Sequence, residues 1–175
     1  MNNWPNKYKI LESTNLFTLG DYNLVPIRFK DRYLIMKWRN EQIYHLRQSE
    51  KLTKKQQDDY FNSVVFELFN LEKPNQILFS LLKKNKLIAY GGLVHINWTS
   101  KEAEISFLID TILDKEYFRT YWDTFIKIIQ NLSFINLSFN RIYTFSFNLR
   151  PKLYDVLEKN NFKEERRIKN KYFKK

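Results

Sequence analysis

The amino-acid sequence predicts an α+β fold, in which a mixed and mostly antiparallel twisted sheet is flanked by helices. Two patterns lead to this prediction. Three apolar segments at 76–82, 87–97 and 102–109 are separated by short polar turns, which indicates an antiparallel meander. Apolar residues then recur every three or four positions from 115 to 134, which predicts a long amphipathic helix.

The segments before the meander add one strand and two helices to this prediction. A strand is predicted at 22–27, and Pro26 indicates that it lies at a sheet edge because proline cannot donate to the ladder. A first helix is predicted at 31–40. The second, at 53–70, begins with a capping-box pattern at Thr53, which marks a helix start.

The segments after the long helix complete the predicted order. A strand is expected at 141–147, a helix at 151–159 and a final strand at 162–173. A chain of 175 residues fits a single domain. We expect residues 1–21 to form an N-terminal extension and residues 22–175 to form the domain.

Composition limits the classes of protein that the sequence can belong to. Hydrophobic residues make up 43% and aromatic residues 17%, which excludes a disordered chain. The net charge of +11 favours anionic ligands. Without cysteine there is no thiolate chemistry, and with two histidines we expect no metal site. No leader or long apolar run is present, so we expect a cytoplasmic protein without a membrane partner.

Three segments resemble the GNAT superfamily of N-acetyltransferases. Residues 87–94 (LIAYGGLV) look like its third strand and 103–109 (AEISFLI) like its fourth, while 157–165 (LEKNNFKEE) look like its "LEKxGFxEE" ending. The predicted order of elements is also similar, and the resemblance covers residues 22–173. The segment 38–40 (WRN) looks most like the ribosomal-protein N-terminal acetyltransferases and the amino-sugar acetyltransferases of the pseudaminic-acid pathway.

This resemblance implies acetyl-CoA as co-substrate, but the expected pyrophosphate loop departs from the family pattern. The pattern Q/R-x-x-G-x-G/A falls on residues 117–122 (YFRTYW), where Thr120 and Trp122 replace the glycines. The helix N-terminus still supplies N–H groups, and Arg119 with Lys115 is expected to offset part of the loss. The resemblance assigns the following residues to the cofactor: Leu108, Ile109, Lys115, Arg119, Thr120, Tyr121, Trp122 and Asn148.

Acetyl transfer to an amine requires a base, an oxyanion donor and an acid. If Asn97 pairs with Glu102 across the meander turn, His95 lies opposite Glu104 on the same sheet face, and this pair is our candidate for the base. The other interpretation is that His95 only caps a polar patch. The resemblance implies that backbone N–H groups near Leu108 and Ile109 bind the oxyanion.

Two further roles have a structural alternative. Tyr154 is the candidate acid, because Leu157 occupies the position where the family often has its tyrosine, but Tyr154 also fits a core aromatic residue. Asn148 is expected to bind the pantetheine arm or to cap the helix that follows it.

The first two helices and the meander offer candidate residues for the acceptor. Arg39 and Arg47 are candidates to hold a nucleotide diphosphate, because guanidinium groups match phosphate geometry. The alternative is that they face solvent or a surface carboxylate. Stacking on a base is assigned to Trp38, which also fits a core position. The candidate substrate-binding residues are Trp38, Arg39, Asn40, Arg47 and Tyr90.

The sequence therefore predicts an acetyl-CoA-dependent N-acetyltransferase, and three functions remain open. The first is acetylation of an amino sugar on a nucleotide carrier, so that the acceptor is a phosphorylated small-molecule amine. The second is acetylation of a protein N-terminus. The third is a noncatalytic binding module with a degenerate cofactor loop. Nucleic-acid binding ranks last because no RNA-binding module is recognisable. We expect a monomer or a homodimer.

Overall fold

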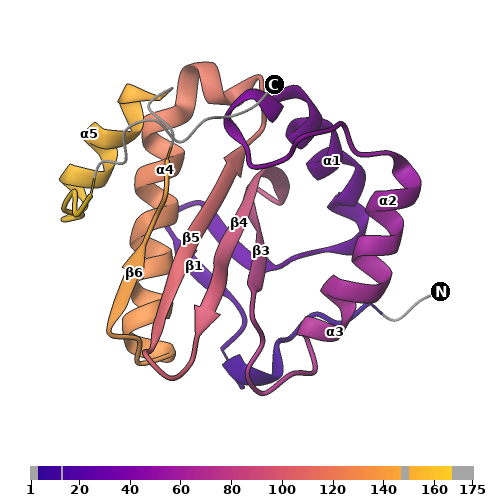
Figure 1. Cartoon of the computed structure of the whole chain (residues 1–175), viewed down its shortest axis with the longest axis horizontal. Coiled ribbons are helices and arrows are strands. Elements are labelled where there is room, and N and C mark those ends of the chain that lie inside the picture. Colours follow the sequence, from indigo (N-terminus) through magenta and orange to yellow (C-terminus); the bar gives the residue numbers. More distant parts are fainter. Residues whose placement is uncertain (1–3, 13, 147–149, 167–175) are drawn as a thin grey trace.

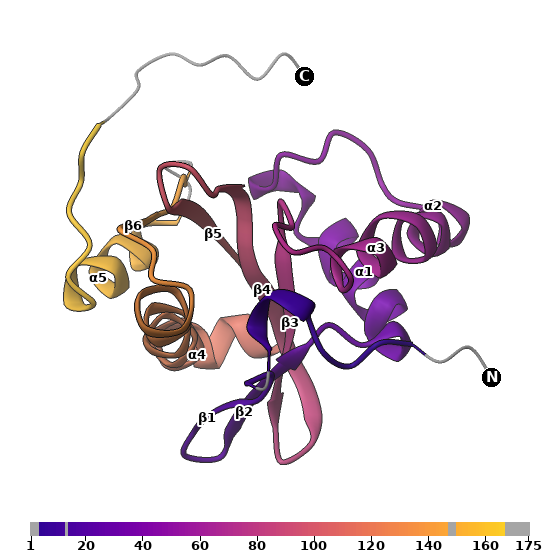
Figure 2. The same cartoon turned by 90° about the horizontal axis from the view of Figure 1, so that it is seen from below.

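The computed structural model describes residues 4–12, 14–146 and 150–166 of the chain. They form a six-stranded sheet between two layers of helices (Figures 1 and 2). The strands are β1 (Phe17–Leu19), β2 (Tyr22–Pro26), β3 (Ile77–Lys83), β4 (Lys86–Asn97), β5 (Glu102–Ile109) and β6 (Arg141–Tyr143). They lie in sequence order, with β1 to β5 antiparallel and β6 parallel to β5, so the predicted α+β class and the meander are confirmed.

One face of the sheet is covered by the helices of the N-terminal half and the other by those of the C-terminal half (Figure 2). The α-helices are α1 (Arg32–Glu41), α2 (Lys54–Asp59), α3 (Phe66–Leu68), α4 (Leu113–Asn131) and α5 (Pro151–Lys159). Two π-helical stretches, Tyr60–Val65 and Leu132–Asn136, join α2 to α3 and extend α4. Short 3-10 turns are Lys9–Leu11, Phe29–Asp31 and Ile43–His45.

The predicted capping box is present at the start of α2. The Thr53 hydroxyl accepts a hydrogen bond from the Gln56 backbone N–H at 3.2 Å, and the Gln56 side chain accepts one from the Thr53 N–H at 2.8 Å. These bonds satisfy two N–H groups at the helix end, one in the first turn and one at the cap.

Three local predictions need correction. Pro26 does not mark an edge, because β2 lies between β1 and β3; the proline is the last residue of the strand. The strand expected at 141–147 ends at Tyr143 among the described residues. The final strand expected at 162–173 is absent from its described part, residues 162–166, and the remainder lies outside the described residues.

The segment that was expected to be an extension joins the folded unit. Strand β1 pairs with β2, and Tyr8 is fully buried, stacked on Phe69 with its hydroxyl donating to the Leu78 carbonyl at 2.7 Å. Trp4 donates to the Ile27 carbonyl at 2.9 Å. The described residues before position 22 therefore contribute to the core of the domain.

Two adjacent glycines let the central strands approach one another. A Cβ atom at Gly91 would lie 2.3 Å from the carbonyl oxygen of Ser106 on β5, and one at Gly92 would lie 2.0 Å from that of Ile77 on β3. Backbone atoms cannot move aside as a flexible side chain can. The spacing of β3, β4 and β5 at this level therefore requires glycine at both positions.

We predict that Gly91→Ala lowers the free energy of unfolding by about 3 kcal/mol, as expected for overpacking against backbone. The matched control is Gly20→Ala, where a Cβ meets nothing within 4 Å and only the positive φ of 56° opposes it. The control should lose about 1 kcal/mol. Urea denaturation measures both, and equal losses would contradict the steric explanation.

Candidate active site

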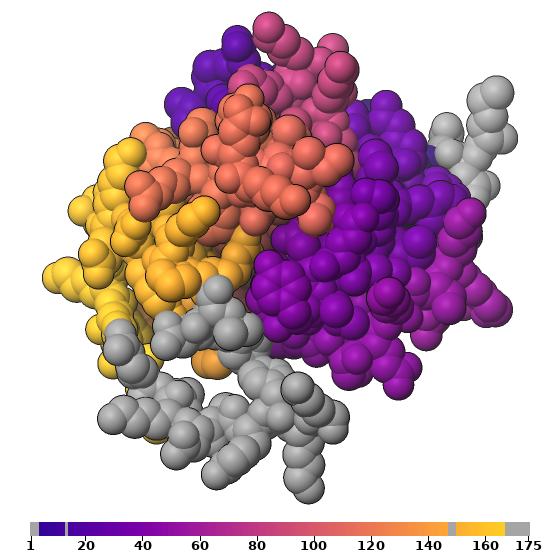
Figure 3. Space-filling model, turned by 90° about the horizontal axis from the view of Figure 1, so that it is seen from above, coloured from indigo at the N-terminus to yellow at the C-terminus, as the bar shows by residue number. Residues whose placement is uncertain are grey.

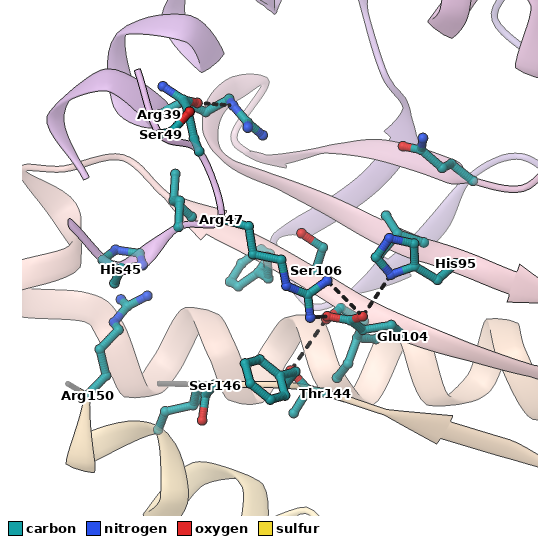
Figure 4. A pocket seen from close by; sticks show the side chains of 18 of the residues that line it. Arg39, His45, Arg47, Ser49, His95, Glu104, Ser106, Thr144, Ser146 and Arg150 are labelled. Carbon is teal, nitrogen blue, oxygen red and sulfur yellow. Dashed lines mark hydrogen bonds and ion pairs between the residues drawn. The ribbon is translucent and has the colours of Figure 1, made fainter. Parts of the chain in front are cut away.

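The sheet opens where β6 ends. Three residue pairs, from Glu102 with Arg141 to Glu104 with Tyr143, join β5 to β6. Beyond them the Thr144 hydroxyl reaches the Ile105 carbonyl at 3.4 Å, at the end of the paired stretch. The residues that follow on β5 and after β6 line one pocket of about 620 Å³, so the pocket lies where the two strands separate (Figure 4).

Residues from both halves of the chain line this pocket. Figure 3 views the molecule from the side on which the violet N-terminal half meets the orange and yellow C-terminal half. The polar and charged lining residues are Arg39, His45, Arg47, Gln48, Ser49, Glu50, Lys51, Gln56, Gln76, His95, Glu104, Ser106, Thr144, Ser146 and Arg150. Apolar side chains also line it: Leu46, Leu52, Val94, Ile105, Phe107, Trp122, Phe145 and Leu153. The pocket is thus built by residues far apart in sequence.

Glu104 is the centre of the polar contacts in the pocket (Figure 4). Its carboxylate lies 2.8 Å from His95 Nδ1, and it accepts from Arg47 Nη2 at 2.9 Å and Nη1 at 3.3 Å. Glu104 is only 7% exposed, whereas the His95 side chain is 61% exposed. A buried carboxylate therefore holds an exposed imidazole by one ring nitrogen.

A β-bulge brings His95 to Glu104, where a regular ladder was predicted. Val94 pairs with Glu104 and Asn97 pairs with Glu102, so β4 has two residues, His95 and Ile96, opposite one residue of β5. His95 takes a positive φ of 49°. The predicted contact between His95 and Glu104 is present, although the predicted direct pairing is not, because the bulge redirects the imidazole.

Arg39 carries a charge without a carboxylate partner. Its Nη1 donates to the Tyr90 hydroxyl and its Nε donates to Gln48 Oε1, each at 3.0 Å. Among the described residues, no carboxylate lies within ion-pair distance of this guanidinium, which is partly buried in the pocket wall. A partly buried cation with neutral partners favours an anionic ligand, because its desolvation is not offset by an opposite charge.

A second basic group lies on the other side of the pocket. Arg150 Nη2 forms an ion pair with Asp114 Oδ1 at 2.8 Å, and its guanidinium lies over the Phe118 ring. Burial raises the pKa of the Asp114 carboxyl, and Arg150 opposes part of this change. Burial and the nearby Arg150 charge lower the pKa of His45 from 6.5 to about 4. His45 is therefore neutral in the folded protein at physiological pH.

The low pKa of His45 predicts a pH-dependent stability. Between pH 6.5 and 4 the unfolded chain binds a proton at His45 that the folded chain does not, so the free energy of unfolding falls as the pH is lowered through this range. Denaturation at several pH values measures this fall, which should be smaller in His45→Gln. Identical pH dependences for the variant and the natural sequence would refute the assignment.

The expected pyrophosphate loop is part of a helix. Helix α4 begins at Leu113, so residues 117–122 lie inside it, and Trp122 is 4% exposed. The connection from β5 to α4 is only residues 110–112. Its Asp110 carboxylate accepts hydrogen bonds from the backbone N–H groups of Ile112 at 2.8 Å and Leu113 at 3.2 Å. The predicted loop is therefore wrong, because counting back from the helix end misplaced its start.

The directions in which the backbone groups of β5 point change the choice of oxyanion donor. The Ile105 carbonyl accepts from the Thr144 hydroxyl, and the Ile109 carbonyl accepts at 2.8 Å from the Gln42 side-chain amide. Both carbonyls therefore face away from β4. Because successive residues of a strand point their backbone groups to opposite sides, the N–H of Phe107 faces the gap and that of Leu108 faces β4. Of the two expected donors, Ile109 lies on the gap side and Leu108 does not.

The predicted acceptor residues differ in their positions. Trp38 is 1% exposed and belongs to the core, so it cannot stack on a base. Asn40 holds the backbone of Leu52 by two hydrogen bonds of 2.8 Å each, and Tyr90 contacts Arg39. Arg47 binds Glu104 instead of standing free. Arg39 alone keeps the predicted form of an anion-binding side chain.

The other predicted residues lie outside the pocket wall. Tyr154 is half-buried on α5 and does not line the pocket in the described part of the chain. Arg119 is exposed and pairs with Asp155 at 2.7 Å, and Tyr121 is buried against Tyr22. Lys115 and Thr120 are exposed on α4. Asn148 lies outside the described residues.

Sequence reasoning missed several pocket residues. His45, Gln48 and Arg150 sit in connections, where no periodic pattern marks a side chain as facing a pocket. Thr144 and Ser146 fell inside the strand predicted at 141–147, and only the observed end of the pairing with β5 shows that they line the pocket.

Comparison with solved structures shows that N-acetyltransferases share the fold of this sheet and its flanking helices. The Vibrio cholerae spermidine N-acetyltransferase in complex with CoA and spermine has a similar structure, with a TM-score of 0.74 at 18% identity over 89% of this chain and 88% of that chain. A dodecameric structure of this V. cholerae enzyme gives a TM-score of 0.68 at 19% identity, covering 89% and 86%. No curated protein sequence matches.

The sequence itself matches the acetyltransferase (GNAT) domain family over residues 24–175. The chain therefore belongs to the GNAT acetyltransferase family, whose reaction is the transfer of an acetyl group from acetyl-CoA to an amine. None of the helices in the described ranges is long and apolar enough to span a membrane.

Proposed function

We propose that this protein acetylates the primary amine of an anionic small molecule, and that an amino sugar on a nucleotide carrier is the first candidate. The observation that carries this proposal is the pocket at the strand opening. The His95–Glu104–Arg47 contacts lie there in the same cavity as Arg39, which has no carboxylate partner among the described residues. The first group of contacts suits proton transfer. Arg39 suits recognition of a negative charge.

In this proposal His95 is the base. Its Nδ1 is held by the Glu104 carboxylate, which favours the tautomer with the proton on Nδ1 and leaves Nε2 to accept a proton from the amine. Arg47 fixes the carboxylate through two contacts, so Glu104 orients the imidazole. Acetyl-CoA supplies an acetyl group on a thioester, and the gap-side N–H groups of β5 are suited to stabilise its developing oxyanion.

The residues present fit acetyl-CoA unequally. The strand opening fits the acyl end, because it offers N–H groups on the gap side and the apolar side chains of Phe107 and Leu153. The start of α4 does not fit a pyrophosphate, because Asp110 already occupies its N–H groups. This second observation favours the noncatalytic module as the alternative function.

The charges of the pocket support the proposal of an anionic acceptor in place of a polyamine. The spermidine N-acetyltransferases that share the fold act on a polycation. Here arginine and lysine outnumber carboxylates in the pocket wall: the charged lining residues are Arg39, Arg47, Glu50, Lys51, Glu104 and Arg150. Both carboxylate–arginine pairs of this region, Glu104 with Arg47 and Asp114 with Arg150, are already neutralised. The remaining charge supports an anionic acceptor.

We predict that His95→Ala lowers kcat/KM by about 100-fold to 1,000-fold, the usual contribution of a general base. Glu104→Gln should cause a smaller loss because it keeps the shape but weakens the hold on the ring. The control is Glu102→Gln, two residues earlier on β5 and paired with Arg141 outside the pocket, which should keep its activity. Full activity in His95→Ala would exclude His95 as the base.

We predict that Arg39→Gln raises KM for an anionic acceptor by about tenfold to 100-fold with little change in kcat, because a charge-assisted contact is lost in both ground and transition states. The assay uses nucleotide-linked amino sugars, the same amino sugars without phosphate, spermidine and short peptides. Arg32→Gln is the control, since Arg32 pairs with Asp58 outside the pocket. Preference for spermidine over every anionic acceptor would overturn the proposed acceptor class.

If the chain is instead a noncatalytic module, no amine in this panel is acetylated. Two cases then remain: the module binds acetyl-CoA, or it does not. A thermal-shift titration separates these cases, because a ligand at 100 times its dissociation constant stabilises by about 2.7 kcal/mol.

A further inference from the structure

Gln48 is a neutral side chain that contacts Arg39 in the pocket wall. Its Oε1 accepts from Arg39 Nε at 3.0 Å, and the other partner of Arg39, the Tyr90 hydroxyl, is also neutral. The other arginines that line the pocket, Arg47 and Arg150, each pair with a carboxylate. The residue at position 48 therefore decides whether the charge of Arg39 is compensated.

A chain of hydrogen bonds sets the direction of the Gln48 amide. The Leu52 backbone N–H donates to Asn40 Oδ1 and the Leu52 carbonyl accepts from Asn40 Nδ2, each at 2.8 Å. Asn40 Oδ1 also accepts from Gln48 Nε2 at 3.0 Å, and the Glu50 carbonyl accepts from the same nitrogen at 2.7 Å. Because backbone groups have fixed donor and acceptor roles, Gln48 Oε1 must be the atom that faces Arg39.

A carboxylate at position 48 does not fit this chain of hydrogen bonds. Its second oxygen would lie against Asn40 Oδ1 and the Glu50 carbonyl oxygen, and all of these atoms are acceptors. Acceptors that face only other acceptors lose their hydrogen bonds, which is unfavourable. The connection from α1 to α2 therefore favours a neutral amide at the position where a glutamate would form an ion pair with Arg39.

The Arg39 guanidinium keeps donors for a ligand. Its neutral partners use the Nε–H group and one N–H of Nη1, and no described residue accepts from Nη2. The Nη1–Nη2 end of the guanidinium is thus available, and this end matches two oxygens of a carboxylate or a phosphate group. Arg39 and Gln48 both line the pocket, so the available cation and its support belong to the same wall.

We propose that Gln48 determines the charge preference of the acceptor, because its fixed and neutral amide orients Arg39 and leaves the charge of Arg39 uncompensated. Gln48 is a positioning residue that acts through Arg39 and takes no part in the acetyl transfer itself. A glutamate at this position changes the preference and leaves the contact between His95 and Glu104 in place. The inference rests on the proposed function, since it concerns the acceptor of that reaction.

Isothermal titration of the full chain with inorganic pyrophosphate tests this proposal without a known acceptor. We expect Gln48→Glu to raise the dissociation constant about tenfold or more, because the new carboxylate competes with the probe for Arg39. An unchanged dissociation constant overturns the role of Gln48 and leaves the proposed function intact. If the natural sequence does not bind the probe, or Arg39→Gln binds it equally well, the anionic acceptor of the proposed function fails too, so the two failures are distinguishable.

Gln56→Glu is the matched control, because it adds the same charge to the same pocket wall. Gln56 Oε1 only accepts, from the N–H and the hydroxyl of Thr53, so a glutamate keeps the capping box. In the part of the chain that the structure describes, no hydrogen bond joins Gln56 to Arg39. We expect a rise of less than about threefold, the effect of an exposed charge. An equal rise in both variants overturns the specific role of Gln48.

A double-mutant cycle separates the charge of the new carboxylate from a loosened loop. In the Arg39→Gln background, Gln48→Glu should raise the dissociation constant of pyrophosphate by less than about threefold, because its main effect passes through Arg39. A rise as large as in the natural background contradicts the proposal, since Gln48→Glu would then disturb the pocket independently of Arg39.

Acetylation assays give a second measurement if Gln48→Glu does not fold. Gln48→Leu adds no charge but removes the bond that orients Arg39. We expect it to raise KM for nucleotide-linked amino sugars about threefold to tenfold, with kcat unchanged and with little effect on the same amino sugars without phosphate. An unchanged KM, or an equal loss for both kinds of acceptor, overturns the positioning role.

Discussion

The site depends on one limit in the sheet, which is that β6 pairs with β5 for three residue pairs in the part of the chain that the structure describes. Had the ladder continued, backbone groups of β5 would be used by β6 and no cavity would separate the strands. Because it stops after Tyr143, no described strand pairs with β5 on this side from Ile105 onward, and Ile105 and Phe107 line a pocket there. The opening therefore sets both the place of the cavity and the kind of polar group that lines it.

The close packing of the other strands confines this opening to one side of β5. Gly91 and Gly92 hold β3, β4 and β5 together next to it, and the bulge after Val94 turns His95 toward Glu104. One side of β5 is thus tightly paired and the other is released. The contrast gives a rigid support for Glu104 beside a space that a ligand can enter.

The fold was predictable from the sequence, and the site was predictable only in part. The meander, the long helix and the Thr53 capping box follow from local patterns that depend on neighbouring residues. The contact between His95 and Glu104 was found because the two residues lie nine positions apart in adjacent strands. Arg47 as the partner of Glu104 could not be found, since the pair is separated by 57 positions and joined by a connection without periodicity. The start of α4 was misplaced because no glycine or proline marks it at residues 110–114.

The hydrogen bonds between Asn40 and Leu52 have a consequence for the connection that carries Arg47. The Asn40 side chain binds both the N–H and the carbonyl of Leu52, so the backbone from the end of α1 to the start of α2 is closed into a loop. The entropy of ordering that loop is spent during folding and not when a ligand arrives. Arg47 and Gln48 are thus preorganised, and changes at Asn40, which does not line the pocket, would reach the chemistry by loosening the carboxylate that Arg47 holds.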